Sequence, residues 1–203
     1  SDGDRVTVAE LGPGLYHGIG GVAVLLAFAF DCLGDRVYHN RAVSLGESVR
    51  ESATQSIEES DGPVSSLGMV SGVGSLVYTL SKLGELTDES QFLDTAVRIS
   101  ETVAERGVAA DAPSDILSGK AGLLSASAKL FSLRDCDCVR RLLCSCADDL
   151  LQSHSTEESG TTVWKPNCTT PAVGVGHGVS GVVHALAQYD QQIGDERARA
   201  VVD

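Results

Sequence analysis

A short glycine-rich element that recurs four times constrains the fold of this 203-residue chain most strongly. It occupies residues 18–21, 72–75, 119–122 and 178–181, and the first glycines lie 54, 47 and 59 residues apart. A sequence that repeats about every fifty residues is typical of a modular array in which each repeat is one supersecondary unit. We therefore look for a fold in which one structural unit is used four times.

Each glycine element is followed by a helical pattern of apolar residues. The positions four, eight and eleven residues after the first glycine lie on one helical face. Those positions hold Val22, Leu26 and Ala29; Leu76, Leu80 and Leu83; Leu123, Ser127 and Leu130; and Val182, Leu186 and Tyr189. Only Ser127 interrupts this pattern. The repeat therefore predicts an apolar helix that begins at each glycine turn.

Longer and more polar helices are predicted between the apolar ones, at about 39–58, 91–105 and 135–152. Sustained alternation with a period of two, which would indicate strands, does not occur. Apolar helices must be enclosed, and an all-α fold of inner helices ringed by outer helices encloses them. We predict a single α/α toroid domain over residues 1–203 whose glycine turns gather at one end. Helix N-termini gathered there would form a natural binding surface.

The composition narrows the class of protein. The net charge of −13 and the scarcity of lysine are typical of a protein from a high-salt cytoplasm, or of an acidic surface for a basic partner. Nucleic-acid binding is disfavoured because no basic stripe occurs. The longest apolar run, residues 22–30, is too short to span a membrane. The first ten residues show no secretory signal, so we expect a soluble, cytoplasmic protein.

Two cysteine pairs, Cys136-Asp-Cys138 and Cys144-Ser-Cys146, resemble metal ligands. A regular helix over 135–152 would point the two thiols of such a pair about 200° apart, which disfavours chelation. Cys146 falls on the apolar face of that helix, where small buried thiols are ordinary. Disulfides are disfavoured in a cytoplasmic protein. We therefore expect core residues here, with metal binding as the alternative.

The residue before each first glycine is polar: His17, Ser71, Ser118 and His177. The glycines themselves are explained by close contacts between helices. The polar residues that precede them share one end of the predicted ring. His177, for example, is either a polar residue at a helix cap or part of a functional site.

With these elements in register, the chain resembles the lanthionine synthetase C-like family. The matching segments are LGPGLYHGIGGVAVLLAFAF, SLGMVSGVGSLVYTLSKLGELTD, SDILSGKAGLLSASAKLF and GVGHGVSGVVHALAQYDQQIGDERARA. The first segment is most similar to the cyclase domain of class II bifunctional lanthipeptide synthetases. The resemblance implies an α/α toroid with seven repeat units, of which this chain holds about four.

The resemblance also implies a chemistry, because family members add cysteine thiols of a precursor peptide to dehydrated Ser or Thr. His177 in GHGVSG and Asp115 in SDILSGKAG match the family's catalytic residues. A Zn²⁺ ion that activates the thiol is implied for the intact fold.

The chain departs from the family pattern in its metal ligands, because no Cys-His dipeptide occurs in it. The family's ligands lie in later repeats, beyond Asp203, so we expect no metal or other cofactor in this segment. Cys168 and His177 are the one substitute pair near a motif. A second departure is His17, where class II cyclases more often have an acidic residue.

We therefore expect the N-terminal portion of a lanthionine-forming cyclase that is inactive in isolation. One alternative is a non-catalytic module of the same fold that binds a peptide or another partner. Another is a toroid enzyme that acts on carbohydrate, but that chemistry needs paired carboxylates and the glycine turns offer only Asp115. We also expect self-association, because a partial ring exposes the apolar flanks of the inner helices at its open ends.

Overall fold

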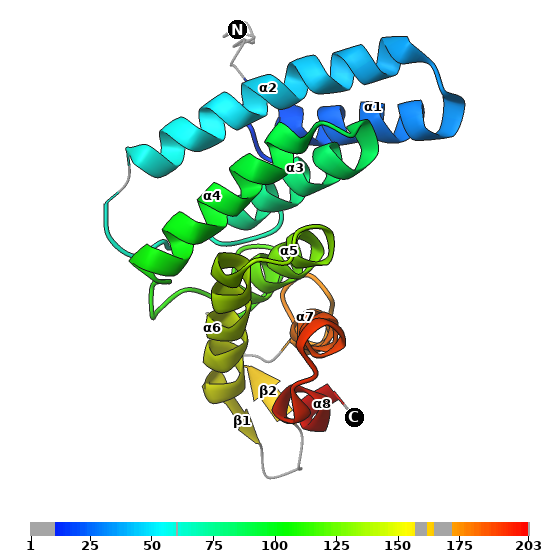
Figure 1. Ribbon diagram of the computed structural model, residues 1–203. Coiled ribbons are helices and arrows are strands. Elements are labelled where there is room, and N and C mark those ends of the chain that lie inside the picture. The colour runs from blue at the N-terminus through cyan, green and yellow to red at the C-terminus, as the bar shows by residue number, and fades with distance from the viewer. Residues whose placement is uncertain (1–10, 60, 157–161, 165–171, 203) are drawn as a thin grey trace, which may run out of the picture.

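The computed structural model describes residues 11–59, 61–156, 162–164 and 172–202, which form eight helices and one short two-stranded ribbon (Figure 1). Four helices follow the glycine turns: α1 (Ile19–Leu33), α3 (Val73–Thr87), α5 (Lys120–Leu133) and α7 (Val179–Ile193). Four others alternate with them: α2 (Arg36–Glu58), α4 (Ser90–Arg106), α6 (Asp137–Ser153) and α8 (Glu196–Val202). The predicted helices and their order are confirmed.

The two sets of helices form two layers. In the inner layer α1 packs against α3, α3 against α5, and α5 against α7. In the outer layer α2 packs against α4, α4 against α6, and α6 against α8. This curved double layer is part of an α/α toroid, as the repeat predicts. No helix in the described part of the chain is both long and apolar enough to cross a membrane.

The core lies between the two layers and is richest around α3 and α5. Leu80, Leu83, Leu123 and Leu130 are all fully buried there. Burying one leucine side chain contributes about 1.5–3 kcal/mol to the free energy of folding. These positions therefore supply much of the hydrophobic stabilisation between neighbouring repeats. Ser127, which interrupts the apolar pattern, is also fully buried, and its hydroxyl has no hydrogen-bond partner in the described structure.

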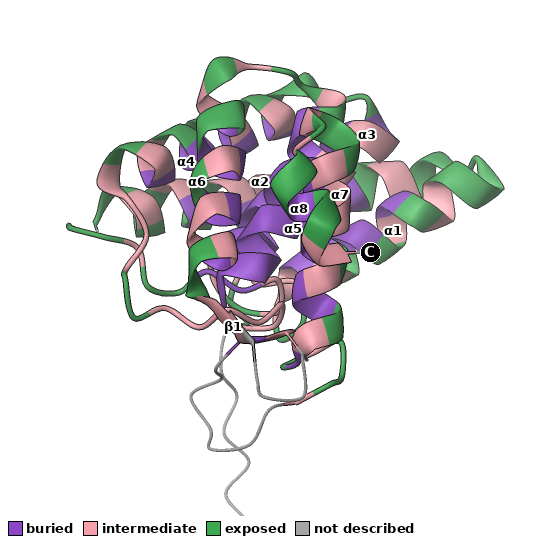
Figure 2. Ribbon diagram, turned by 90° about the horizontal axis from the view of Figure 1, so that it is seen from below, coloured by how far each residue is buried: buried purple, intermediate pink, exposed green. Residues whose placement is uncertain are grey.

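The first inner helix is not enclosed. Along α1, Val22 is 45%, Leu25 67% and Leu33 68% exposed, and Figure 2 shows exposed residues along this helix. The outward positions of α7, in contrast, include the polar residues Ser180 and His184. The expectation of exposed apolar flanks therefore holds strongly for α1, whereas the exposed part of α7 is largely polar.

A small ribbon adds an element that the sequence pattern does not predict. Strand β1 (His154–Thr156) pairs antiparallel with β2 (Thr162–Trp164). Each strand has three residues, which is too short for a period of two to be recognised. The ribbon anchors Trp164, which is buried and donates its indole N–H to the Leu150 carbonyl over 2.8 Å.

The cysteine pair at the start of α6 also differs from expectation. The helix begins at Asp137, and Cys136 precedes it in an extended conformation. As a result, the two thiols are not on opposite sides of a helix, and Cys136 Sγ lies 3.3 Å from Cys138 Sγ. Burial raises the pKa of the Cys138 thiol to about 11, and the neighbouring thiol adds to this effect. Cys146 is a buried core residue, as predicted.

Candidate functional site

The glycine turns share one backbone arrangement. The first amide of each inner helix donates a hydrogen bond to a carbonyl seven residues earlier. The pairs are Ile19 to Gly12, Val73 to Ser66, Lys120 to Pro113 and Val179 to Ala172, with N···O distances of 2.8–2.9 Å. The same carbonyl occupies the place where a Cβ atom on the preceding glycine would lie. Glycine is thus required here for space.

This arrangement limits what the helix N-termini can contribute to the predicted binding surface. The first amide of each inner helix already donates to a backbone carbonyl. In α5, for example, the amides of Lys120, Ala121 and Gly122 donate to the carbonyls of residues 113, 114 and 115. The first amide of each inner helix is therefore not free to bind a ligand.

The turns lie side by side at one end of the ring, as predicted. The amides of Met69 and Val70 in the second turn donate to the carbonyls of Ile116 and Leu117 in the third. The amide of Leu117 in turn donates to the Gly176 carbonyl in the fourth, over 3.3 Å. These backbone bonds bring residues from separate repeats within reach of one another.

Asp115 in the third turn and His177 in the fourth form a direct contact. His177 Nδ1 lies 3.1 Å from Asp115 Oδ2, although the two residues are 62 positions apart in the sequence. The Asp115 side chain is only 16% exposed, whereas that of His177 is 65% exposed. The imidazole can therefore meet a ligand while the carboxylate holds it from behind.

Ser118 fixes the orientation of Asp115. Its backbone N–H and its hydroxyl donate to Asp115 Oδ1 over 2.7 and 3.0 Å, and the hydroxyl also lies 3.1 Å from Oδ2. The amide of Gly119 donates to the Asp115 carbonyl, which fixes the backbone of the same residue. Of the polar residues that precede a glycine, Ser118 and His177 therefore belong to one site.

Trp164 is a site residue that the sequence analysis missed. It lines a small hollow of about 20 Å³ together with Asp115, His177 and Val182. Because its indole N–H is bonded to Leu150, Trp164 contributes an apolar wall. It is the single tryptophan of the chain, but no spacing in the sequence relates it to the glycine turns.

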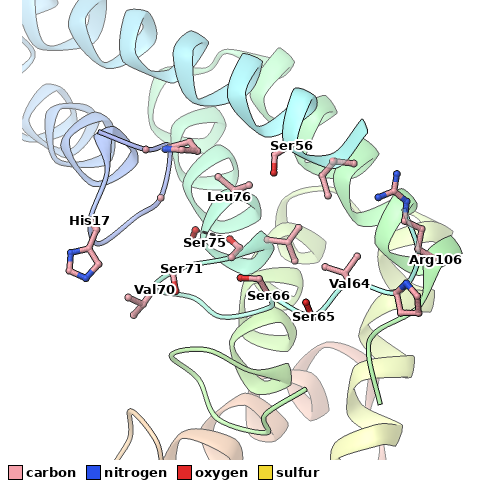
Figure 3. A pocket seen from close by; sticks show the side chains of 18 of the residues that line it. His17, Ser56, Val64, Ser65, Ser66, Val70, Ser71, Ser75, Leu76 and Arg106 are labelled. Carbon is pink, nitrogen blue, oxygen red and sulfur yellow. Dashed lines mark hydrogen bonds between the residues drawn. The ribbon is translucent and has the colours of Figure 1, made fainter. Parts of the chain in front are cut away.

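His17 and Ser71 lie elsewhere. Both line a larger cavity between the first and second turns (Figure 3). Neither lines the hollow beside Asp115. The shared end of the ring thus carries two separate places at which side chains could meet a ligand.

The residues present do not fit a zinc site. Within the described ranges, no group of three or more His, Cys, Asp or Glu side chains could hold a metal ion. The oxygens of Asp115 already accept hydrogen bonds from Ser118 and contact His177. Cys168, the substitute partner for His177, lies outside the described residues.

Comparison with known proteins agrees with the fold and the motifs. The family model "Lanthionine synthetase C-like protein" matches residues 9–203. The structure is similar to nisin cyclase, with a TM-score of 0.75 and 14% sequence identity, over 95% of this chain and 57% of that one. At this identity the likeness concerns the fold, and the chain spans little more than half the length of that structure. A search of curated protein sequences gave no match. The repeats, the toroidal layers and the family match together show that this chain belongs to the lanthionine synthetase C-like family.

Proposed function

We propose that this chain is the N-terminal portion of a lanthionine-forming cyclase. In the intact protein, cysteine thiols of a precursor peptide would add to dehydrated Ser or Thr residues and form thioether rings. The observation that carries this proposal is the contact between His177 Nδ1 and Asp115 Oδ2, which joins the two positions that match the family's catalytic residues.

The reaction requires a proton donor after the carbon–sulfur bond has formed. The thiolate sulfur attacks the β-carbon of the dehydrated residue, and the electron pair of the double bond moves to form an enolate. A general acid then protonates the α-carbon. An imidazolium at position 177 suits this step because Nδ1–H can donate to Asp115 while Nε2–H delivers the proton.

Asp115 acts as a positioning residue in this proposal. Its carboxylate faces the imidazole and is held by the N–H and hydroxyl of Ser118. A carboxylate on Nδ1 orients the ring and selects the tautomer whose free nitrogen is Nε2. Trp164 and Val182 form an apolar wall beside the pair.

Family membership is consistent with Zn²⁺ in the intact fold, where it would lower the pKa of the peptide thiol when bound. The residues described here do not form that site, so we assign no step of the metal chemistry to them. We propose that its ligands lie in further repeats of the intact fold. The segment of 203 residues should consequently form no thioether rings by itself.

The test compares variants of the intact cyclase on a dehydrated precursor peptide. His177→Asn should slow ring formation by roughly 10²–10⁴-fold, the usual contribution of a general acid. His184→Asn is the matched control, because His184 is exposed on α7 and has no hydrogen-bond partner in the described structure. This variant should leave the rate of ring formation unchanged. Rings are counted by alkylating the remaining thiols and measuring the peptide mass.

The same experiment separates the alternative function. If His177→Asn leaves both the rate and the yield of rings unchanged, the catalytic proposal is wrong and a non-catalytic peptide-binding module is favoured. Thioether formation by the isolated 203-residue chain would contradict the proposed dependence on further repeats.

A further inference from the structure

A cavity of the described structure lies between the first and second glycine turns, away from the His177–Asp115 pair. It measures about 560 Å³, which is within the range of small-molecule sites. Its walls are mainly apolar and include Ile57, Val64, Val70 and Leu76. Figure 3 shows Arg106 at one end of the cavity and His17 at the other. No residue that lines it also lines the hollow beside Asp115.

Arg106 is the unusual feature of this cavity. Its Nη1 atom is buried and has no hydrogen-bond partner. A buried donor without an acceptor costs about 1–3 kcal/mol, and more when the group is charged. The guanidinium therefore has hydrogen-bonding capacity that no described residue uses, and an anionic acceptor would suit it best.

An arginine without a carboxylate partner is unexpected in a protein with this excess of acidic residues. The chain carries 28 acidic and 15 basic residues, so carboxylates are plentiful. The other described arginines and lysines without an ion pair are all exposed: Arg36, Arg41, Arg98 and Arg141. Within the described ranges Arg106 is the one partly buried basic residue that pairs with no carboxylate. Asp61, which also lines the cavity, forms no ion pair with it.

The backbone next to Arg106 is tied to the cavity wall by hydrogen bonds. Arg106 is the last residue of α4, and the Gly107 amide closes the helix on the Val103 carbonyl over 2.9 Å. The Val64 amide donates to the Gly107 carbonyl, and the Ala109 amide donates to the Val64 carbonyl. The backbone at the end of α4 and the cavity wall at Val64 are thus fixed relative to each other.

We propose that this cavity binds a monocarboxylate on a short apolar stem, with the carboxylate on Arg106. The apolar walls at Ile57, Val64 and Leu76 would take the stem. A single guanidinium matches one carboxylate in charge and in bidentate geometry. The strongly acidic chain disfavours multivalent anions. The ligand is either a free acid or an acidic side chain of a peptide.

The experiment titrates the 203-residue chain with three probes by calorimetry: 4-methylpentanoate, a capped Leu-Glu-Leu peptide with its Leu-Gln-Leu counterpart, and inorganic phosphate. If 4-methylpentanoate binds and neither peptide does, the ligand is a free acid. If the Leu-Glu-Leu peptide binds more tightly than the Leu-Gln-Leu peptide, the ligand is an acidic side chain of a peptide. Either result supports the site. Arg106→Gln should weaken this binding at least about tenfold, because a hydrogen bond to a charged group is lost.

Three further variants sharpen the test. Arg98→Gln removes the same charge from an exposed position on the same helix and should leave the affinity unchanged. Asp61→Asn removes a carboxylate from the cavity and should tighten binding by roughly two- to threefold. Ser65→Phe fills the cavity and leaves Arg106 intact, so it should abolish binding even if Arg106→Gln fails to fold.

Several outcomes overturn the proposal. If Arg106→Gln binds the carboxylate probes as tightly as the parent chain does, Arg106 is not part of the site. Binding of phosphate without binding of either carboxylate probe would show that the anion class is wrong. The absence of binding for all three probes at millimolar concentration would show that Arg106 serves only the C-terminal end of the α4 dipole.

Discussion

The glycine turns allow a test of why this sequence folds as it does, and Gly178→Ala is the sharpest perturbation. Gly178 has φ −124°, a conformation that alanine adopts easily, so backbone strain is not the issue. A Cβ atom at this position would lie 2.6 Å from the Gly174 nitrogen and closer still to the Ala172 carbonyl oxygen. That carbonyl accepts the first hydrogen bond of α7, from the Val179 amide over 2.9 Å.

The magnitude follows from these contacts. Forcing a methyl group into backbone atoms at this range costs about 1–3 kcal/mol as overpacking. Losing the Val179 hydrogen bond adds about 0.5–1.5 kcal/mol. Replacing glycine with alanine restricts the unfolded chain and returns about 0.4–1 kcal/mol. We therefore expect the free energy of unfolding to fall by about 1–3 kcal/mol, and the melting temperature by roughly 3–10 °C.

The assay is thermal and urea unfolding, followed by helical circular dichroism. Gly174→Ala is the matched control in the same turn, because a Cβ atom there has no neighbour within 4 Å and the residue is exposed. That variant should change the unfolding free energy by less than about 0.5 kcal/mol. Equal stability of the two variants would refute the explanation that these glycines are required for space.

Two further predictions concern pH and association. Hydrogen bonds from Arg197 lower the pKa of Asp195 to about 2, so the carboxylate stabilises the fold above pH ~4 and this contribution is lost as the pH falls toward 2. Asp195→Asn should therefore lower stability by about 1–2 kcal/mol at pH 5 and by almost nothing at pH 2, measured by thermal unfolding; an equal loss at both pH values contradicts this. We also propose self-association through the exposed stripe of α1. Leu25→Lys should then shift sedimentation toward the monomer, and a parent chain that is monomeric at all concentrations, including in high salt, would exclude it.

Much of the fold could be predicted because the repeat carries its own periodicity. The glycine spacing, the apolar face after each turn and the polar helices between them gave the order and type of the main helices. The resemblance to the lanthionine synthetase C-like family then named Asp115 and His177, and the structure brings their side chains into contact.

Other features had no local signal. Cys136 reads as helical by pattern, yet it lies just outside α6 in an extended conformation, and this places its thiol against Cys138. Trp164 reaches the site on a ribbon of three-residue strands that no periodicity reveals. Ser118 is one of several serines near glycine turns, and only the folded backbone shows that it holds Asp115.

The sequence by itself determined the repeat, the helices and the chemical types available at the turns, because these depend on spacing along the chain. Only the tertiary structure decided which turn residues meet. Hydrogen bonds between the backbones of successive turns bring Asp115 and His177 together. Likewise, only the folded chain shows that Arg106 lies beside a cavity and that its Nη1 atom has no hydrogen-bond partner. Such contacts join residues far apart in sequence, and local periodicity carries no information about them.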